Sequence, residues 1–125
     1  MILIDTHVLL WLLFDDNKLS YSAKNALENN KCCVSIISFW ELALKTSLGK
    51  LRLPKTLSQI LLECEKMAID VVNVTFEDCI GVQTLPFIHR DPFDRMIISH
   101  AMTENMPLVT HDSNIHKYNT IEIIW

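Results

Sequence analysis

The sequence has little glycine and proline, and it lacks a hydrophobic run long enough to cross a membrane. Two glycines and four prolines among 125 residues leave no room for a long flexible linker. The longest apolar run, Val8 to Phe14, is far shorter than the roughly 20 residues of a spanning helix. Internal repeats and low-complexity tracts are also missing. These features predict one domain, residues 1–125.

The start of the chain also lacks the marks of a secretory signal. No Lys or Arg precedes the first apolar stretch, Asp5 interrupts it, and no small-residue cleavage site follows. The four cysteines form no C-x-x-C pair and match no zinc-binding spacing. We therefore expect reduced cysteines in the core of a cytoplasmic protein that has no membrane attachment.

Charge composition leaves the class of partner open. The formal net charge is −4, which seems unfavourable for binding nucleic acid. If the four acidic residues discussed below are set aside, however, the remaining 11 acids balance the 11 Lys and Arg residues. A bound dication would add further positive charge. Nucleic acid is therefore neither required nor excluded.

Short apolar segments alternate with segments of helical periodicity, which predicts an α/β domain with a mainly parallel, roughly five-stranded sheet. The predicted strands are Met1–Ile4, Cys32–Ile37, Ile69–Val74, Pro107–Thr110 and Thr120–Trp125. The predicted helices are Thr6–Phe14, Ser20–Glu28, Ser38 to about Gly49, Thr56–Met67 (with Leu57, Ile60, Leu61 and Cys64 on one face), Phe76–Gln83 and Asp91–Glu104. Of the predicted helices, Phe76–Gln83 is the shortest.

Five acidic residues fall at one edge of this predicted sheet. Asp5 ends the first strand, Glu41 lies in the first turn after the second, and Asp112 follows the fourth. Asp91 and Asp94 begin the helix that leads back into the fourth strand, so they lie at the same edge. Open α/β sheets bind ligands at the carboxyl ends of their strands.

Taken singly, most of these acids have a purely structural explanation. Glu41 could complete a capping box with Ser38 or pair with Lys45. Asp91 could be an N-cap, with Pro92 at the first helical position, or could pair with Arg95. Asp94 could be a favourable charge in a first helical turn, and Asp112 could begin a turn with Ser113 and Asn114.

Taken together, the acids predict a metal site. Asp5 closes an apolar strand with no cation nearby in sequence, so its carboxylate needs partners. Two carboxylates about 4 Å apart repel by roughly 4 kcal/mol at an effective dielectric near 20. A helix cap contributes only about 1 kcal/mol. A converging cluster therefore needs protonation or a dication, and oxygen ligands favour Mg²⁺ or Mn²⁺ over zinc.

Four segments, in this order, resemble the PIN-domain family, and most closely the VapC-type toxins of bacterial toxin–antitoxin pairs. They are ILIDTHVLLWLL, SIISFWELALKTSLGKL, HRDPFDRMIISHA and LVTHD, and they extend over nearly the whole chain. The resemblance implies a PIN-like α/β/α sandwich. It also assigns the acids of the family's active site to Asp5, Glu41, Asp94 and Asp112, both as catalytic residues and as metal ligands.

The resemblance further implies Mg²⁺-dependent hydrolysis of RNA, with Mn²⁺ able to substitute, in a homodimer inhibited by a small antitoxin encoded nearby. Asp91, Thr6 and Thr110 would support the acids from outside the metal shell, although Thr6 and Thr110 could equally be capping residues. The candidate cations for RNA phosphates are Lys45, Arg90 and Arg95, with Lys50, Arg52 and His89 as further possibilities.

Several alternatives stay open at this stage. Trp11 and Trp40 could stack on bases, but core or dimer packing is the better expectation. The helix Thr6–Phe14 is apolar nearly all round, which favours burial in a dimer interface. A non-catalytic PIN-like scaffold is the main rival. A receiver-type phosphoacceptor domain fits less well, because the first strand supplies one acid only, the third does not end in Asp, and the last lacks a Lys.

Overall fold

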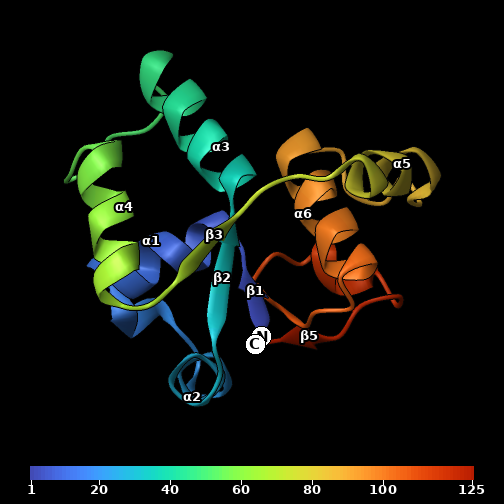
Figure 1. Cartoon of the computed structure of the whole chain (residues 1–125), viewed down its shortest axis with the longest axis horizontal. Coiled ribbons are helices and arrows are strands. Elements are labelled where there is room, and N and C mark those ends of the chain that lie inside the picture. The colour runs from blue at the N-terminus through green and yellow to red at the C-terminus, as the bar shows by residue number, and fades with distance from the viewer.

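The computed structural model describes all 125 residues as a five-stranded sheet between two layers of helices (Figure 1). The strands are β1 (Ile2–Ile4), β2 (Cys32–Ser35), β3 (Asp70–Val72), β4 (Leu108–Val109) and β5 (Ile123–Ile124). The α-helices are α1 (Thr6–Phe14), α2 (Tyr21–Asn29), α3 (Ile36–Ser47), α4 (Leu57–Lys66), α5 (Phe76–Thr84) and α6 (Pro92–Thr103). Two short 3-10 helices, η1 (Asp16–Lys18) and η2 (Ile115–Lys117), complete the fold.

The sheet has the strand order β3-β2-β1-β4-β5, and every neighbouring pair is parallel. The predicted α/β/α architecture is therefore confirmed. Because all strands run in one direction, their carboxyl ends lie along one edge. The helices α1 and α3 follow β1 and β2 after at most one residue, so both begin at that edge.

Alternation along β1 divides the core into two layers. Ile2 and Ile4 pack in a cluster with residues of α1, α2 and α4, whereas Leu3 packs on the other face with Ile97 and Ile98 of α6. Figure 1 shows α1, α2 and α4 on one side of the sheet and α5 and α6 on the other. None of the helices is both long and apolar enough to span a bilayer.

The largest error of the sequence-based prediction lies between β2 and α3. The strand ends at Ser35, and the side chain of Ser35 caps α3 by accepting a hydrogen bond from the Ile37 N–H at 3.1 Å. Ser38 is therefore buried inside the first turn and does not open the helix, so the proposed Ser38–Glu41 capping box does not form. Ile36 and Ile37 are β-branched and therefore resembled a continuation of the strand. The cap at Ser35, three residues before Ser38, sets the start of the helix.

Two smaller expectations were also wrong. Leu61 was placed on the inward face of α4, but it is 41% exposed while Ile60 and Cys64 are fully buried. Cys79 lies on the surface, in contrast to the three buried cysteines; all four are free thiols. The positive φ of Gly49, 69°, agrees with its predicted place at the end of α3.

The helices α5 and α6 pack closely, and hydrogen bonds at Asp78 connect α5 to the last turns of α6. Asp78 of α5 is fully buried and accepts hydrogen bonds from the Thr75 N–H and from the Thr103 hydroxyl. Its carboxylate also lies 2.5 Å from His100 Nδ1, so His100 is a hydrogen-bonded core residue as expected. Burial raises the pKa of Asp78, but the bonds from Thr103 and His100 outweigh it and hold the pKa below its ordinary value.

A substitution at Gly81 tests this helix contact. A Cβ at Gly81 would lie 2.2 Å from Ser99 Oγ, which donates a 2.6 Å hydrogen bond to the Asp78 carbonyl. We expect Gly81→Ala to lower the free energy of unfolding by about 1–3 kcal/mol, measured by thermal or urea denaturation. Adding Ser99→Ala should recover part of the loss, since Ser99 Cβ would be 3.5 Å away. A Gly81→Ala protein that unfolds like the wild type would contradict this account of the packing.

Candidate active site

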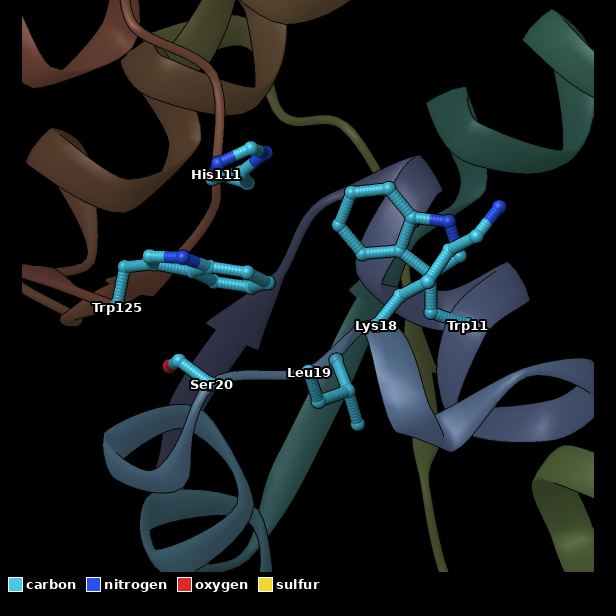
Figure 2. Close-up of a pocket in the computed structure, with 6 residues that line it drawn as sticks. All are labelled: Trp11, Lys18, Leu19, Ser20, His111 and Trp125. Atoms are coloured by element: carbon cyan, nitrogen blue, oxygen red, sulfur yellow. The ribbon is translucent and has the colours of Figure 1, made fainter.

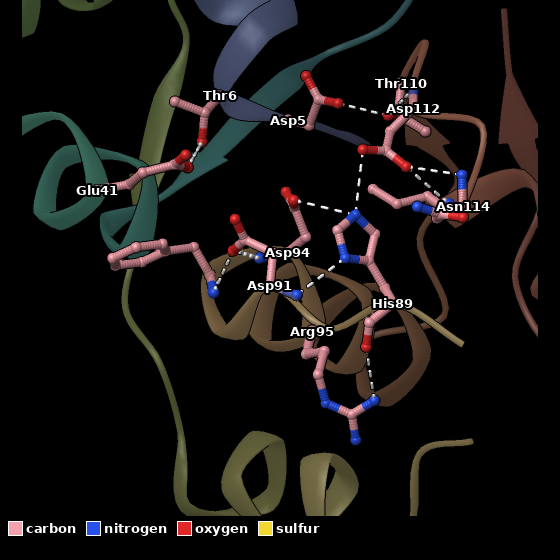
Figure 3. Close-up of polar contacts among 12 residues, drawn as sticks. Asp5, Thr6, Glu41, His89, Asp91, Asp94, Arg95, Thr110, Asp112 and Asn114 are labelled. Carbon is pink, nitrogen blue, oxygen red and sulfur yellow. Dashed lines mark hydrogen bonds and ion pairs between the residues drawn. The ribbon is translucent and has the colours of Figure 1, made fainter. Parts of the chain in front are cut away.

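Asp5 is held at the carboxyl end of the central strand by two hydrogen bonds. As the N-cap of α1, its Oδ1 accepts the Val8 N–H at 2.8 Å, and its Oδ2 accepts the Thr110 hydroxyl (Figure 3). The residue is only 3% exposed. Burial raises the pKa of Asp5 above its ordinary value despite these two bonds, because the charged form is poorly solvated.

Glu41 reaches the same edge from α3 and is 2% exposed. The Thr6 hydroxyl donates to Glu41 Oε1 at 2.7 Å and is hydrogen-bonded to the Ser38 hydroxyl at 2.9 Å. The Lys45 ammonium group pairs with Glu41 Oε2, as the i,i+4 spacing suggested. Burial lowers the pKa of Lys45, but its bond to Glu41 outweighs that effect and leaves the pKa raised. Lys45 is thus committed to Glu41 and is not a free cation for phosphate.

The beginning of α6 has the predicted form. Asp91 is the N-cap, and its Oδ1 accepts the N–H groups of Phe93 at 2.8 Å and Asp94 at 3.2 Å. Pro92 occupies the first turn, where a missing N–H does no harm. The capping role of Asp91 is therefore confirmed, and the alternative ion pair with Arg95 does not form.

Asp94 shows that the acids converge. Burial raises the pKa of Asp94, and the negative charges of Asp91, Glu41, Asp5 and Asp112 raise it further, to about 8. Each of these four residues is therefore close enough to repel a charge on Asp94. The sheet edge brings together all five acids that the strand order placed there, and at neutral pH one of them keeps its proton unless a cation is present.

His89 is the site residue that the sequence reasoning misassigned, because it was considered only as a cation for phosphate. It is 7% exposed, and its Nε2 lies 3.1 Å from Asp112 Oδ2 and 3.2 Å from Asp94 Oδ2. Its Nδ1 accepts the Asp91 N–H at 3.1 Å, so the ring proton sits on Nε2 and points at the two carboxylates. The spacing His-Arg-Asp-Pro, with His two residues before an N-cap, was the available signal.

Asp112 is fixed by the backbone of the turn that follows it. Its Oδ1 accepts the N–H groups of Asn114 at 2.8 Å and Ile115 at 3.0 Å, and its own N–H donates to Thr110 Oγ1 at 3.1 Å. Burial raises the pKa of Asp112, but the hydrogen bond from His89 and these backbone bonds outweigh it and lower the pKa overall. Thr110 therefore links Asp5 to Asp112 through a single hydroxyl (Figure 3).

Arg95 has a structural role, which corrects the prediction that it contacts RNA phosphates. Its guanidinium group donates to four backbone carbonyls at 3.1–3.3 Å, those of Val82, Leu85, Pro86 and His89. It also lies 4.4 Å from the centre of the Phe87 ring. At 7% exposure it fastens the segment that carries His89 to α6. Arg90, Lys50 and Arg52 are exposed and remain candidates.

The donor set suits a dication. Ligand atoms of His89, Asp94 and Asp112 lie within 4.8 Å of one another, and Asp5 and Glu41 add further oxygens whose charges reach Asp94. Oxygen ligands favour Mg²⁺ or Mn²⁺. The Nε2–H group of His89 donates to Asp94 and Asp112, so in this arrangement the ring orients the two carboxylates and is not itself a ligand. A cavity of about 220 Å³, lined by Asp5, His7, Trp11, His111 and Asp112, opens beside these ligands.

Comparisons with known proteins agree with this fold. The family model of the PIN domain matches residues 2–120, so the chain belongs to the PIN domain family. A search of curated proteins finds no significant match.

Solved structures of toxin–antitoxin complexes share the fold. One is a chain of VapBC2 from Rickettsia felis bound to a promoter DNA fragment, with a TM-score of 0.69 and 19% identity over 98% of this chain and 97% of that one. Another is a chain of DNA-bound VapBC from Salmonella typhimurium, with a TM-score of 0.65 and 18% identity over 98% of this chain and 97% of that one. VapBC-5 from Mycobacterium tuberculosis gives 0.62 at 16% identity, covering 98% and 96%.

Exchanging the buried guanidinium group tests the role of Arg95. Lysine cannot reach four carbonyls in a fixed fork, so Arg95→Lys should lower the free energy of unfolding by about 2 kcal/mol or more. The exposed neighbour offers a matched control: Arg90→Lys should change stability by less than about 0.5 kcal/mol. Equal stability of the two variants would refute the structural assignment of Arg95.

The raised pKa of Asp94 predicts how the metal-free protein responds to pH. The folded state holds the Asp94 proton up to about pH 8, whereas the unfolded state releases it near the ordinary value of 3.8. In EDTA, the free energy of unfolding should therefore fall as pH rises from about 5 to 8. Asp94→Asn should flatten this decline, and Mg²⁺ should oppose it in the wild type only. Thermal melting across that pH range checks this, and a stability that rises with pH equally in both proteins would contradict it.

Proposed function

We propose that this protein is a Mg²⁺-dependent endoribonuclease and the toxin of a toxin–antitoxin pair. The observation that carries the proposal is the gathering of Asp5, Glu41, Asp94 and Asp112 at one edge of the sheet. Burial and, after it, the neighbouring negative charges raise the pKa of Asp94 to about 8. Repulsion among these acids destabilises the folded protein, so we would not expect it in a cluster with a purely structural role. A bound dication would replace the repulsion between the carboxylates with attraction to the ion, and Mn²⁺ would substitute for Mg²⁺.

Each residue has a distinct role in this proposal. Asp5 and Asp94 would hold the ion directly, while Glu41 and Asp112 would complete its shell directly or through water. The hydroxyl groups of Thr6 and Thr110 orient Glu41 and Asp5 through the bonds described above. Asp91 acts from outside the shell, because its Oδ1 is engaged in capping α6.

The reaction would be in-line attack of water on the phosphorus of an RNA phosphodiester. When bound, Mg²⁺ would lower the pKa of the attacking water and neutralise charge that develops on the phosphate oxygens. Asp112 is the most exposed of the four acids, with 33% of its side chain accessible, and would accept the water's proton. The bond from phosphorus to the 3′-oxygen breaks, leaving 5′-phosphate and 3′-hydroxyl ends.

The partners follow from the same assignment. A small antitoxin encoded nearby would inhibit the enzyme by occupying or covering the acidic edge, and the toxin would act as a homodimer in the cytoplasm. The fold neighbours from VapBC complexes support this part of the proposal. Light scattering of the purified chain would measure the oligomeric state, and growth arrest on induced expression would measure toxicity.

The central test replaces one carboxylate without changing its shape. We expect Asp5→Asn to reduce EDTA-sensitive cleavage of single-stranded RNA by more than about 100-fold, because a direct ligand should matter more than an outer-shell residue. The amide oxygen can still cap α1, so the fold should persist. Asp16→Asn, at an exposed position in η1, is the matched control and should cleave like the wild type.

The same variants separate loss of metal from loss of fold. Mn²⁺ or Mg²⁺ should raise the melting temperature of the wild type and of Asp16→Asn, and much less that of Asp5→Asn. Cleavage by Asp5→Asn at the wild-type rate would exclude the assigned centre. A wild type that neither gains stability from metal nor cleaves RNA would favour the non-catalytic scaffold.

A further inference from the structure

Four aromatic rings from three separate segments gather beside the acidic site. His7 and Trp11 lie one turn apart on α1, His111 precedes Asp112, and Trp125 follows β5. The centre of the Trp11 ring is 5.9 Å from that of His7, 5.9 Å from that of His111 and 5.7 Å from that of Trp125. The rings of His111 and Trp125 are 4.8 Å apart and tilted by 35°. The parallel sheet brings them to this edge for the same reason that it brings the acids there.

Three of these rings, those of Trp11, His111 and Trp125, line a pocket that adjoins the acidic cavity. The pocket has a volume of about 400 Å³ and is lined by Trp11, Lys18, Leu19, Ser20, His111 and Trp125 (Figure 2). Trp11 and His111 also line the cavity that contains Asp5 and Asp112. A ligand could therefore extend from the carboxylates to Trp125 without leaving the surface of the protein. The volume lies within the usual range of about 300–1,000 Å³ for small-molecule sites.

The lining indicates the chemistry of the occupant. Leu19 is the only aliphatic side chain of the pocket, and no carboxylate lines it. Lys18 provides a cation whose side chain is 59% exposed and only loosely paired with Asp15, at 3.5 Å. This lining suits a flat aromatic group that carries a phosphate, because it combines planar rings with a cation beside the acidic edge. It suits an aliphatic peptide side chain less well.

We propose that this aromatic pocket is a nucleobase subsite, in which a base next to the scissile phosphate stacks among Trp11, His111 and Trp125. The proposal rests on the ribonuclease function above and adds the residues that would hold a base of a single-stranded RNA substrate. Bases stack on aromatic side chains when they are free to leave a helix, and duplex RNA does not present them in this way. Stacking tolerates any base, so the subsite positions the strand with little sequence preference.

Binding experiments test the subsite without requiring cleavage. The probe is a fluorescein-labelled, mixed-sequence single-stranded RNA of about twelve nucleotides, with Ca²⁺ in place of Mg²⁺. We expect Trp125→Leu and His111→Ala to weaken binding by roughly 5- to 150-fold, the range for loss of one stacked base. Phe76→Ala removes a ring that is 75% exposed on α5, far from the pocket, and should bind like the wild type. His111 is exposed, so its variant should fold even if the Trp125 variant does not.

Photocross-linking locates the base directly. An RNA of the same sequence with 5-iodouridine should attach to Trp11, His111 or Trp125, as identified by mass spectrometry. In cleavage assays with Mg²⁺, both pocket variants should raise KM more than they lower kcat, because stacking acts on bound substrate and transition state alike. Removing the stacked base from the RNA should produce the same loss, with no further loss in Trp125→Leu.

The outcomes for the subsite and for the enzyme differ. Wild-type affinity in both pocket variants, or cross-links confined to other residues, overturns the nucleobase subsite while leaving the ribonuclease assignment intact; the pocket would then belong to a protein partner. A wild type that binds no RNA and cleaves none overturns both. Weaker binding in the pocket variants alone, with cross-links in the pocket, supports the subsite.

Discussion

Mutual repulsion among carboxylates is the constraint on which the rest of the site depends. A parallel sheet with β1 at its centre brings Asp5, Glu41, Asp94 and Asp112 to one edge. The burial of Asp5 and Glu41 removes water that would screen their charges. The surrounding residues can be understood as responses to this repulsion. Lys45 neutralises Glu41, the His89 ring proton is shared between Asp94 and Asp112, and the hydroxyl groups of Thr6 and Thr110 supply donors to Glu41 and Asp5.

These responses do not remove the repulsion completely. Burial and the remaining negative charges together hold the pKa of Asp94 near 8, whereas the pKa of Asp112, which has the better-placed donors, falls below its ordinary value. The two acids share His89 but differ in what else they contact, since Asp112 also receives two backbone N–H groups. The remaining electrostatic repulsion is therefore greatest at Asp94, where the acids of the sheet edge meet the first turn of α6. A dication centred there would gain most from the arrangement, which is the physical basis for assigning Asp94 to the ion.

The sequence was sufficient for those parts of the fold that depend on local patterns. The bounds of α1 were predicted without error, and Asp91-Pro92 correctly marked the start of α6, because caps and apolar periodicity act over a few residues. The start of α3 was misplaced because Ser35 and Ser38 are equally good N-cap residues in sequence. Only the three-dimensional structure shows that Ser35 is the cap and that Ser38 is hydrogen-bonded to Thr6. The convergence of the acids was predictable from strand order, although no acid alone would have revealed it.

Long-range contacts account for what the sequence could not show. Arg95 resembles a surface cation in sequence, yet it is buried because the carbonyls of α5 and the following loop happen to surround it. His89 was misassigned for the complementary reason: its partner Asp112 is 23 residues away in the chain. Trp11 was expected to pack in the core or in a dimer, and it does contact the core, but its ring also borders two connected cavities. The same sheet edge thus has an acidic half bounded by α6 and an aromatic half bounded by α1 and β5. A strand of RNA is divided in the same way, because its charge lies on the phosphates and its flat apolar surfaces are the bases. One edge of the sheet can therefore bind a phosphate at its acidic half, through a metal ion, and the adjacent base at its aromatic half.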